Sequence, residues 1–298
     1  MLDLIMNFKK RIEEHHNLVE AMCLSNSDGL IWKEQYMKRN YRNIYSHSKS
    51  FTSLMVGIAI DEKKLSLDTR FVDVFKDEIS EDDYKRLYDI TVKDLLTMSS
   101  GFDCVLLMSE QRKEGIGYPD YFKFVISHEL KYKPGSKFCY SNGDTYLLGR
   151  MVAKVYNCSF YKLCYEKIFI PLEIGLPMWD TCPNGYCMAA TGLHLNVEEM
   201  NRLGILFINK GVYKGRRIVS EEYVDMCSKA QIKSDGWGDY SYQFWMVPEG
   251  DGYRCDGAWG QITFIWPKYD VVFSFQRPED DKLGLVLDIL REEILSKL

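Results

Sequence analysis

The chain has 298 residues, of which 46% are hydrophobic and 27% are charged, and its formal net charge is −5. These values are typical of a globular protein with one large α/β domain or two smaller lobes. A negative balance is unfavourable for a nucleic-acid partner, because phosphate recognition needs Lys and Arg gathered on one surface. The sequence contains no run of eighteen apolar residues, so we predict no membrane span.

The first elements are predicted to be a helix, a hairpin and a second helix. Apolar residues recur at helical spacing near the start of the chain, at Leu2, Ile5, Phe8 and Ile12. Residues 21–36 alternate as two short strands around the turn signal Asp28-Gly29. The stretch "SFTSLMVGIAIDEKK", residues 50–64, then predicts an apolar helix.

Helical spacing dominates the middle of the chain, and the remainder is mixed. The predicted helices of the middle segment cover residues 91–101, 120–130 and 142–156. We expect Gly101 to stop the first of them. Residues 196–211 predict an amphipathic helix that begins near an Asn cap. Residues 241–276 predict three or four strands, and residues 281–298 a last amphipathic helix.

This order of elements predicts an α+β fold. Strand-forming stretches lie at both ends of the chain and helical stretches lie between them, so one antiparallel sheet would be assembled from both termini and flanked by helices. We assign residues 1–62 and 186–298 to a discontinuous α/β sheet domain and residues 63–185 to an inserted, mostly helical domain. A site is expected in the cleft between them.

The stretch "NIYSHSKSFTS", residues 43–53, contains four serines, and only Ser46 has a lysine three residues on, Lys49. At the start of a helix this spacing places both side chains on one face, from which His47 would point away. A serine hydroxyl needs a base to become a nucleophile, and a lysine can act as that base when burial or nearby positive charge lowers its pKa. The pair alone is weak evidence, because a helix-capping serine followed by an exposed lysine has the same spacing.

Two other stretches carry groups suited to such a relay. Tyr140-Ser141-Asn142 precedes a predicted helix. A phenol beside a lysine can move protons, and an amide can orient a nucleophile or a substrate carbonyl. In "CDGAWGQ", Gly257 and Gly260 would let a strand edge approach a ligand closely. Such an edge beside a serine can supply an N–H group to an oxyanion hole.

Together these motifs resemble the serine β-lactamase and penicillin-binding-protein superfamily, in particular its class C β-lactamase-like and esterase branch. The likeness runs from about residue 23 to residue 275. It rests on "SHSK" at 46–49, "YSN" at 140–142 and "CDGAWGQ", with "ITVKDLLTMSSGF", "FIPLEIGLPMWDT" and "AATGLHLNVEEMNRLG". The resemblance implies a β-lactamase/DD-peptidase-like fold and two-step acyl transfer through a serine ester.

The resemblance also implies roles for single residues. Ser46 would be the acylated nucleophile and Lys49 its proton acceptor. Tyr140 would be the partner base that activates the leaving group or water, and Asn142 would hold the substrate or Lys49. The backbone N–H groups of Ser46 and Ala258 would form the oxyanion hole.

The third motif departs from the family pattern. The family usually begins it with Lys or His, and here the triplet is Cys255-Asp256-Gly257. A neutral thiol cannot recognise a substrate carboxylate, and Arg254 faces the opposite side of the strand. Cys255 and Gly257 stay in the predicted substrate site, where Trp259 would suit an apolar or ring-bearing group as well as simple packing.

We therefore expect a serine hydrolase that acts on a small, uncharged ester, amide or peptide substrate, an esterase or amidase rather than a true β-lactamase. Two alternatives stay open: a degenerate family member that binds a ligand without turnover, and a genuine β-lactamase or DD-peptidase. A cysteine-centred redox or metal protein is a third class, which we disfavour.

The remaining expectations concern the environment of the protein. Its nine cysteines are irregularly spaced and form no Cys-x-x-Cys pair, and the chain begins without a signal-peptide pattern. We therefore expect reduced thiols and a cytoplasmic protein. The predicted relay needs no metal and no organic cofactor, and its partner would be a small-molecule substrate. The sequence leaves open the oligomeric state and whether residues 102–119 act as a lid.

Overall fold

A six-stranded sheet joins the two ends of the chain in this computed structural model, which describes residues 1–16, 18–38, 41–102, 105–113, 117–236 and 238–298. The strand order is β2-β1-β10-β9-β8-β7, and every neighbouring pair is antiparallel. The strands are β1 Ala21–Asn26, β2 Gly29–Gln35, β7 Trp245–Val247, β8 Gly252–Gly257, β9 Gln261–Trp266 and β10 Val271–Gln276. The pairing of Ala21 with Gln276 closes the sheet between N-terminal and C-terminal segments.

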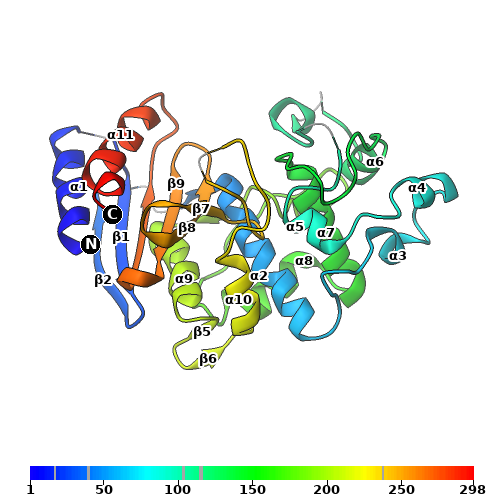
Figure 1. Ribbon diagram of the computed structural model, residues 1–298, viewed down its shortest axis with the longest axis horizontal. Helices are drawn as coiled ribbons and strands as arrows, with labels where there is room; N and C mark the ends of the chain where they lie inside the picture. Colours follow the sequence, from blue (N-terminus) through cyan, green and yellow to red (C-terminus); the bar gives the residue numbers. More distant parts are fainter. Residues whose placement is uncertain (17, 39–40, 103–104, 114–116, 237) are drawn as a thin grey trace.

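Helices cover both faces of this sheet (Figure 1). Helices α1 Leu2–Glu14 and α11 Leu283–Glu293 lie side by side on one face. Helix α9 Val197–Ile208 lies on the other. Successive side chains of a strand point to opposite faces of the sheet, and both faces of β1 are apolar. Met22 and Leu24 pack towards α1, whereas Cys23 packs towards α9. Helix α9 comes very close to the sheet at Gly204, where a Cβ atom would lie 2.3 Å from Cγ1 of Val272.

The segment between the two groups of strands is mainly helical. Figure 1 places it at the end of the molecule opposite α1 and α11. Its helices are α3 Phe71–Phe75, α4 Glu81–Arg86, α5 Val92–Leu96, α6 Tyr121–Ile126, α7 Asn142–Tyr156 and α8 Phe160–Cys164. Helix α2 Ser48–Asp61 runs from the sheet side into this segment, and α10 Glu221–Cys227 follows α9. The predicted α+β architecture, a sheet from both termini with inserted helices, is confirmed.

The predicted role of Gly101 as the stop of a helix is wrong. Helix α5 already ends at Leu96, and Thr97 caps it. Gly101 instead has φ +99°, and its carbonyl accepts hydrogen bonds from the N–H groups of Lys131 and Tyr132. The glycine is needed for this close backbone contact, because a Cβ atom would lie 2.3 Å from the carbonyl oxygen of Tyr132.

Two pairs of short strands complete the fold. Strand β3 Arg42–Asn43 pairs with β4 His194–Leu195, and β5 Val212–Tyr213 pairs with β6 Arg216–Arg217.

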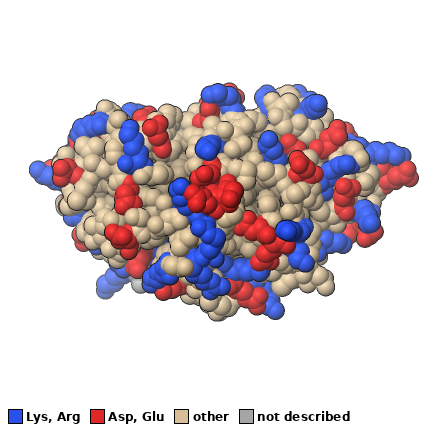
Figure 2. All heavy atoms as spheres, turned by 60° about the horizontal axis from the view of Figure 1, so that its bottom comes forward, with Lys and Arg blue, Asp and Glu red and all other residues tan. Residues whose placement is uncertain are grey.

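On the face drawn in Figure 2, Lys and Arg side chains are interspersed with Asp and Glu side chains. Among the described residues, no helix has both the length and the apolar character needed to cross a membrane.

Candidate active site

Ser46 lies in a single 3₁₀ turn, Tyr45–His47, directly before α2. The turn is fixed from both sides: the amide of Asn43 accepts the Tyr45 N–H at 2.7 Å, and the Ile44 N–H donates to the carbonyl of Leu193 at 2.8 Å. Tyr45 has φ +49°, which is unusual for a residue with a side chain. The N-cap residue of α2 is His47, and its side chain makes no capping bond. The hydroxyl of Ser46 is therefore not consumed as a helix cap.

Lys49, the second residue of α2, is almost completely buried and binds three oxygen atoms. Its Nζ lies 3.0 Å from Oγ of Ser46, 2.5 Å from Oδ1 of Asn142 and 2.9 Å from the carbonyl oxygen of Ala190. The amide nitrogen of Asn142 in turn donates to the carbonyl of Leu107 at 3.0 Å, which fixes the amide orientation. Ser46, Asn142 and Ala190, which are far apart in the sequence, thus all contact the amine of Lys49.

The protonation state of Lys49 follows from its surroundings. Desolvation by burial lowers its pKa well below the usual value, and the positive charge of Arg112 lowers it further. A neutral amine has two N–H donors and one lone pair. Donation to Asn142 and Ala190 uses both donors and leaves the lone pair for the Ser46 hydroxyl. The geometry therefore suits a lysine that accepts a proton from serine.

Tyr140 completes this group, and we call Ser46, Lys49, Tyr140 and Asn142 the Ser46 cluster. The Lys49 ammonium position lies 4.9 Å from the centre of the Tyr140 ring. Burial raises the pKa of Tyr140, a hydrogen bond with Ser46 lowers it, and the negative charge of Asp256 raises it again. The net effect is a pKa above the usual value, so the phenol stays protonated at neutral pH and can donate its proton.

The end of β8 lies against the turn that carries Ser46. A Cβ atom on Gly257 would lie 2.1 Å from the carbonyl oxygen of Ile44, so glycine allows the strand to reach this turn. Ala258 and Trp259 follow in the turn to β9, and both are exposed. Trp259 has φ +63°, and Arg277 donates to its carbonyl at 3.1 Å. The close approach that Gly257 allows is thus to the backbone of the turn that carries Ser46. Trp259, two residues later, is exposed at the surface.

Cys255 lies on the same face of β8 as Gly257 and points towards α2. Its side chain is fully buried, and burial raises the pKa of the thiol to about 12, although a hydrogen bond with Ser50 on α2 opposes the shift. The thiol is therefore neutral. Arg254 and Asp256 share the opposite face of the strand and form an ion pair at 3.0 Å. Cys255 is neutral and Arg254 is paired with Asp256. Neither residue therefore supplies the cation with which this motif usually begins.

His47 is kept out of the relay by its own contacts. Its Nδ1 lies 3.2 Å from the carbonyl oxygen of Gln261 on β9, on the sheet side of the turn. Complete burial lowers its pKa to about 3. The ring is therefore neutral and bound to the sheet, in agreement with the expectation that it points away from the face shared by Ser46 and Lys49.

Part of the segment predicted as a possible lid packs on the Ser46 cluster. The N–H groups of Asn142 and Gly143 donate to the carbonyl of Leu106, and the Asn142 amide also contacts the sulfur of Met108 at 3.0 Å. Residues 103–104 and 114–116 of that segment lie outside the described residues. The lid itself stays a prediction, and the described residues 105–108 act as a support for Asn142.

The carbonyl of Ala190 is a contributor to the site that was missed in the sequence, because a backbone acceptor leaves no trace in residue type; its only signal was its place in the quoted stretch "AATG". Trp245, an aromatic residue near the third motif, packs against the site as well: its ring stacks on Tyr140 at 5.8 Å with an angle of 26°. Tyr240 closes the same aromatic group edge-on to Tyr140 at 6.1 Å. These rings limit the positions that the Tyr140 phenol can take.

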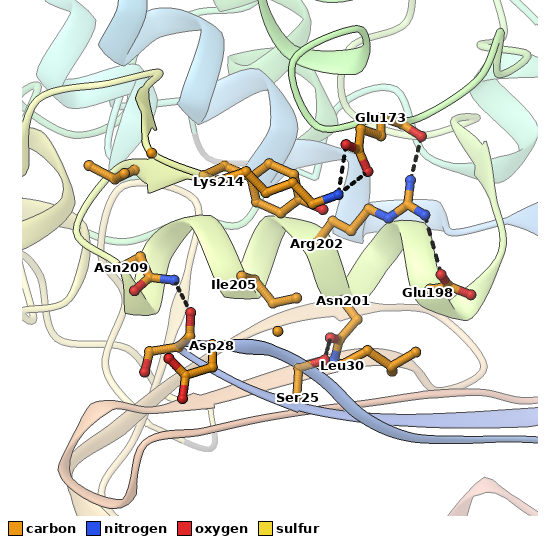
Figure 3. Close-up of a pocket in the computed structure, with 15 residues that line it drawn as sticks. Ser25, Asp28, Leu30, Glu173, Glu198, Asn201, Arg202, Ile205, Asn209 and Lys214 are labelled. Atoms are coloured by element: carbon orange, nitrogen blue, oxygen red, sulfur yellow. Dashed lines mark hydrogen bonds and ion pairs between the residues drawn. The ribbon is translucent and has the colours of Figure 1, made fainter.

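A separate cavity of about 580 Å³ lies between α9 and the β1–β2 hairpin (Figure 3). Its charged side chains pair with one another, as Lys214 does with Glu173 at 2.6 Å and Arg202 with Glu198 at 3.2 Å. No residue of the Ser46 cluster lines it. We therefore take the Ser46 cluster, and not this cavity, as the candidate active site.

The family profile named Beta-lactamase matches residues 40–282 of the chain. The chain belongs to this family. The matched residues include the whole Ser46 cluster and the exposed turn after β8. A β-lactamase-family hydrolase is thus the coarse description that geometry and sequence share.

Curated relatives of this β-lactamase-family chain are distant and longer. Over 169 residues it is 30% identical to a protein of Dichelobacter nodosus described as "Probable fimbrial assembly protein FimD, serogroup H1". The alignment covers 56% of this chain and 42% of the relative. The chain therefore spans less than half the length of that protein.

Solved structures of similar fold cover nearly the whole chain. The "Putative 6-aminohexanoate-dimer hydrolase from Bacillus anthracis" has a TM-score of 0.79 at 17% identity, over 97% of this chain and 81% of that one. EstCE1, a hydrolase with promiscuous acyltransferase activity, has 0.75 at 12%, over 98% and 97%. The octameric penicillin-binding protein homologue from Pyrococcus abyssi has 0.70 at 20%, over 99% and 81%. At these identities the likeness establishes the fold alone.

Proposed function

We propose that this protein hydrolyses a small ester, amide or peptide through an acyl-enzyme on Ser46, as an esterase or amidase rather than a true β-lactamase. One observation carries the proposal: the buried Lys49 Nζ lies 3.0 Å from the Ser46 hydroxyl and has its two other contacts on fixed acceptors. A desolvated lysine with a lowered pKa is a base for serine at neutral pH.

Acylation would proceed by attack of Ser46 Oγ on the substrate carbonyl carbon while its proton passes to Lys49. The carbonyl oxygen becomes an oxyanion, which the backbone N–H groups of Ser46 and Ala258 would bind. The bond to the leaving group then breaks, and the leaving group takes the phenol proton of Tyr140. Lys49 returns its proton to Tyr140, so both bases regain their starting forms.

Deacylation would repeat these proton transfers with water as the nucleophile. Water attacks the acyl carbon and gives a proton to Tyr140, which passes its own proton to Lys49. The bond between the acyl carbon and Ser46 Oγ then breaks, and Lys49 returns the proton to the Ser46 oxygen. Asn142 would hold Lys49 in position throughout, because its amide is itself fixed by the Leu107 carbonyl. The raised pKa keeps the Tyr140 phenol protonated at rest and makes its transient phenolate a strong base.

The preference for an ester or amide over a β-lactam rests on the third motif. Cys255 is neutral and buried, and Arg254 is paired with Asp256, so this strand offers no free cation for a substrate carboxylate. The similar structures include one described as a "Putative 6-aminohexanoate-dimer hydrolase" and a hydrolase with promiscuous acyltransferase activity, which supports an acyl substrate without naming it.

Two alternative functions keep their own support. A degenerate, non-catalytic binder is favoured by the loss of the usual cation at Cys255. A genuine β-lactamase or DD-peptidase is favoured by the fold shared with penicillin-binding protein homologues.

Covalent labelling separates these possibilities. The protein is exposed to a fluorophosphonate, a p-nitrophenyl ester and a penicillin, and the intact mass is measured beside Ser46→Ala. We expect one ester or phosphonate adduct on the wild type and none on Ser46→Ala. Ser48→Ala is the matched control, since the Ser48 hydroxyl is used by the Leu193 N–H at 3.3 Å and should not matter. If the folded wild type formed no adduct, our proposal would be refuted in favour of a non-catalytic binding protein. A stable penicillin adduct would favour the β-lactamase or DD-peptidase alternative.

A further inference from the structure

Arg112 is a cation that the proposed mechanism does not use. It ends the 3₁₀ turn Ser109–Arg112, which follows the residues that support Asn142. The hydroxyl of Tyr121 donates to its backbone carbonyl at 3.2 Å, which fixes the turn against α6. Its Nε atom is buried and makes no hydrogen bond to any part of the chain that the structure describes. A buried guanidinium nitrogen without an acceptor is costly, so a ligand acceptor is the simplest completion of this environment.

Arg112 also lines a cavity of about 430 Å³. Its lining also includes Trp179 and Met188, and Met188 is two residues from Ala190, whose carbonyl binds Lys49. Arg112 itself follows Met108, whose sulfur contacts the Asn142 amide, by four residues. Both walls of the cavity are thus connected by short segments to contacts of the Ser46 cluster, and the positive charge of Arg112 also lowers the pKa of Lys49.

The described carboxylates around Arg112 form no ion pair with it. Asp180 lines the same cavity, yet its carboxylate lies 3.7 Å from Nε2 of His194. Within the described ranges, no carboxylate comes within ion-pair distance of Arg112, whereas its neighbour Lys113 lies 3.8 Å from Glu110. Among the residues that the structure describes, Arg112 is thus left without a carboxylate partner.

We propose that Arg112 binds a carboxylate of the substrate, so that the preferred ester or amide is acidic. This inference rests on the proposed function. It also replaces our expectation of an uncharged substrate, which assumed that a cation could only come from the third motif. A planar guanidinium binds a carboxylate through two parallel hydrogen bonds, and Trp179 and Met188 offer apolar surface to the carbon chain that carries it.

Matched substrate pairs test the contact. The first pair is p-nitrophenyl hydrogen glutarate and p-nitrophenyl pentanoate, which differ by a carboxylate on the acyl part. The second is 3-acetoxybenzoate and phenyl acetate, which differ by a carboxylate on the leaving group. We expect the wild type to prefer the acid of one pair, which tells which part reaches Arg112. In Arg112→Met the ratio of kcat/KM between acid and neutral substrate should fall about 10- to 100-fold.

Comparing the ratio of kcat/KM between acid and neutral substrates also removes effects of Arg112→Met that act through Lys49. Loss of the Arg112 charge changes the Lys49 base for both members of a pair, so any effect through Lys49 cancels. Lys113→Met, which removes an exposed cation one residue away, should leave the ratio unchanged. Equal losses on acid and neutral substrates, or a wild type without preference for either acid, would overturn the proposal.

A binding measurement keeps the test independent of turnover. Glutarate carries carboxylates but no ester, so its Kd can be measured by calorimetry on the wild type, Arg112→Met and Lys113→Met, with folding checked by circular dichroism. The Kd should weaken about 10- to 100-fold in Arg112→Met alone. The same Kd in all three proteins, or no binding to the wild type, would refute the carboxylate contact. A protein that binds glutarate through Arg112 but forms no Ser46 adduct would refute the proposed hydrolase instead.

Discussion

Replacement of Asp144 by asparagine should make the protein more stable at alkaline pH. Asp144 lies in the first turn of α7, two residues after Asn142, and its side chain is fully buried. The Ser100 hydroxyl donates to one carboxyl oxygen at 2.9 Å. The other oxygen is buried without a hydrogen bond to the described residues. Burial raises the pKa of this carboxyl from its ordinary value of 3.8 to about 7.

The size of the effect follows from this pKa. A raised carboxyl pKa means that the folded protein binds the proton more tightly than the unfolded chain, so stability falls as the pH rises from about 4 to 7. At 1.36 kcal/mol per pKa unit, Asp144 costs the folded state about 3 kcal/mol more at pH 8 than at pH 4.5. The asparagine variant has no such cost, although its unpaired amide N–H₂ costs about 1–3 kcal/mol at every pH.

Urea unfolding followed by tryptophan fluorescence measures this difference. At pH 4.5, Asp144→Asn should be equal to the wild type or less stable, and at pH 8 it should be more stable. The difference in free energy of unfolding should change by about 3 kcal/mol between the two pH values. Asp77→Asn, an exposed position in the same helical segment, should show no such change. If the difference in free energy of unfolding between Asp144→Asn and the wild type did not depend on pH, the raised pKa of Asp144 would be refuted.

Three other outcomes are expected. Tyr140→Phe keeps the ring stacked on Trp245 but removes the phenol proton, so kcat should fall about 10²- to 10⁴-fold with little change in unfolding; a loss below threefold would make Tyr140 a packing residue. Because only neutral Lys49 accepts a proton, kcat/KM should rise with pH through a Lys49 pKa that lies well below 10.5, and a rise that begins only near pH 10.5 would contradict this base. Cys255→Lys overfills a closed site and should lower the free energy of unfolding by at least about 1–3 kcal/mol in urea titrations; an unchanged midpoint would show that the site is open.

The parts of the fold with strong periodicity were predictable. Helix α7 begins and ends where the spacing of its apolar residues indicated, and α9 begins at the predicted cap Asn196 through a capping box with Glu199. The hairpin at Asp28-Gly29 is present as well. The two-residue strands β3 and β4 were not predicted, because so short a pairing has no periodicity. They nevertheless hold the turn that carries Ser46.

The candidate site was predictable in its side chains but not in its backbone partners. Motif spacing brought Ser46, Lys49, Tyr140 and Asn142 into one hypothesis, and the structure places them in contact. The Ala190 carbonyl could not be predicted, because any residue type offers one. Arg112 was also missed, since an arginine in an irregular segment has no spacing that relates it to Lys49. Such long-range proximity is set by packing.

The most direct test of the account is the rate at which Ser46 reacts with a fluorophosphonate, measured by intact mass for the wild type and Lys49→Ala at pH 7.5. Lys49→Ala removes the donor of Asn142 Oδ1 and of the Ala190 carbonyl, so its folding is checked by circular dichroism before the rates are compared. We predict a single adduct on the wild type and a rate about 10²- to 10⁴-fold lower in Lys49→Ala. Equal rates in the two folded proteins would contradict the claim that Lys49 activates Ser46.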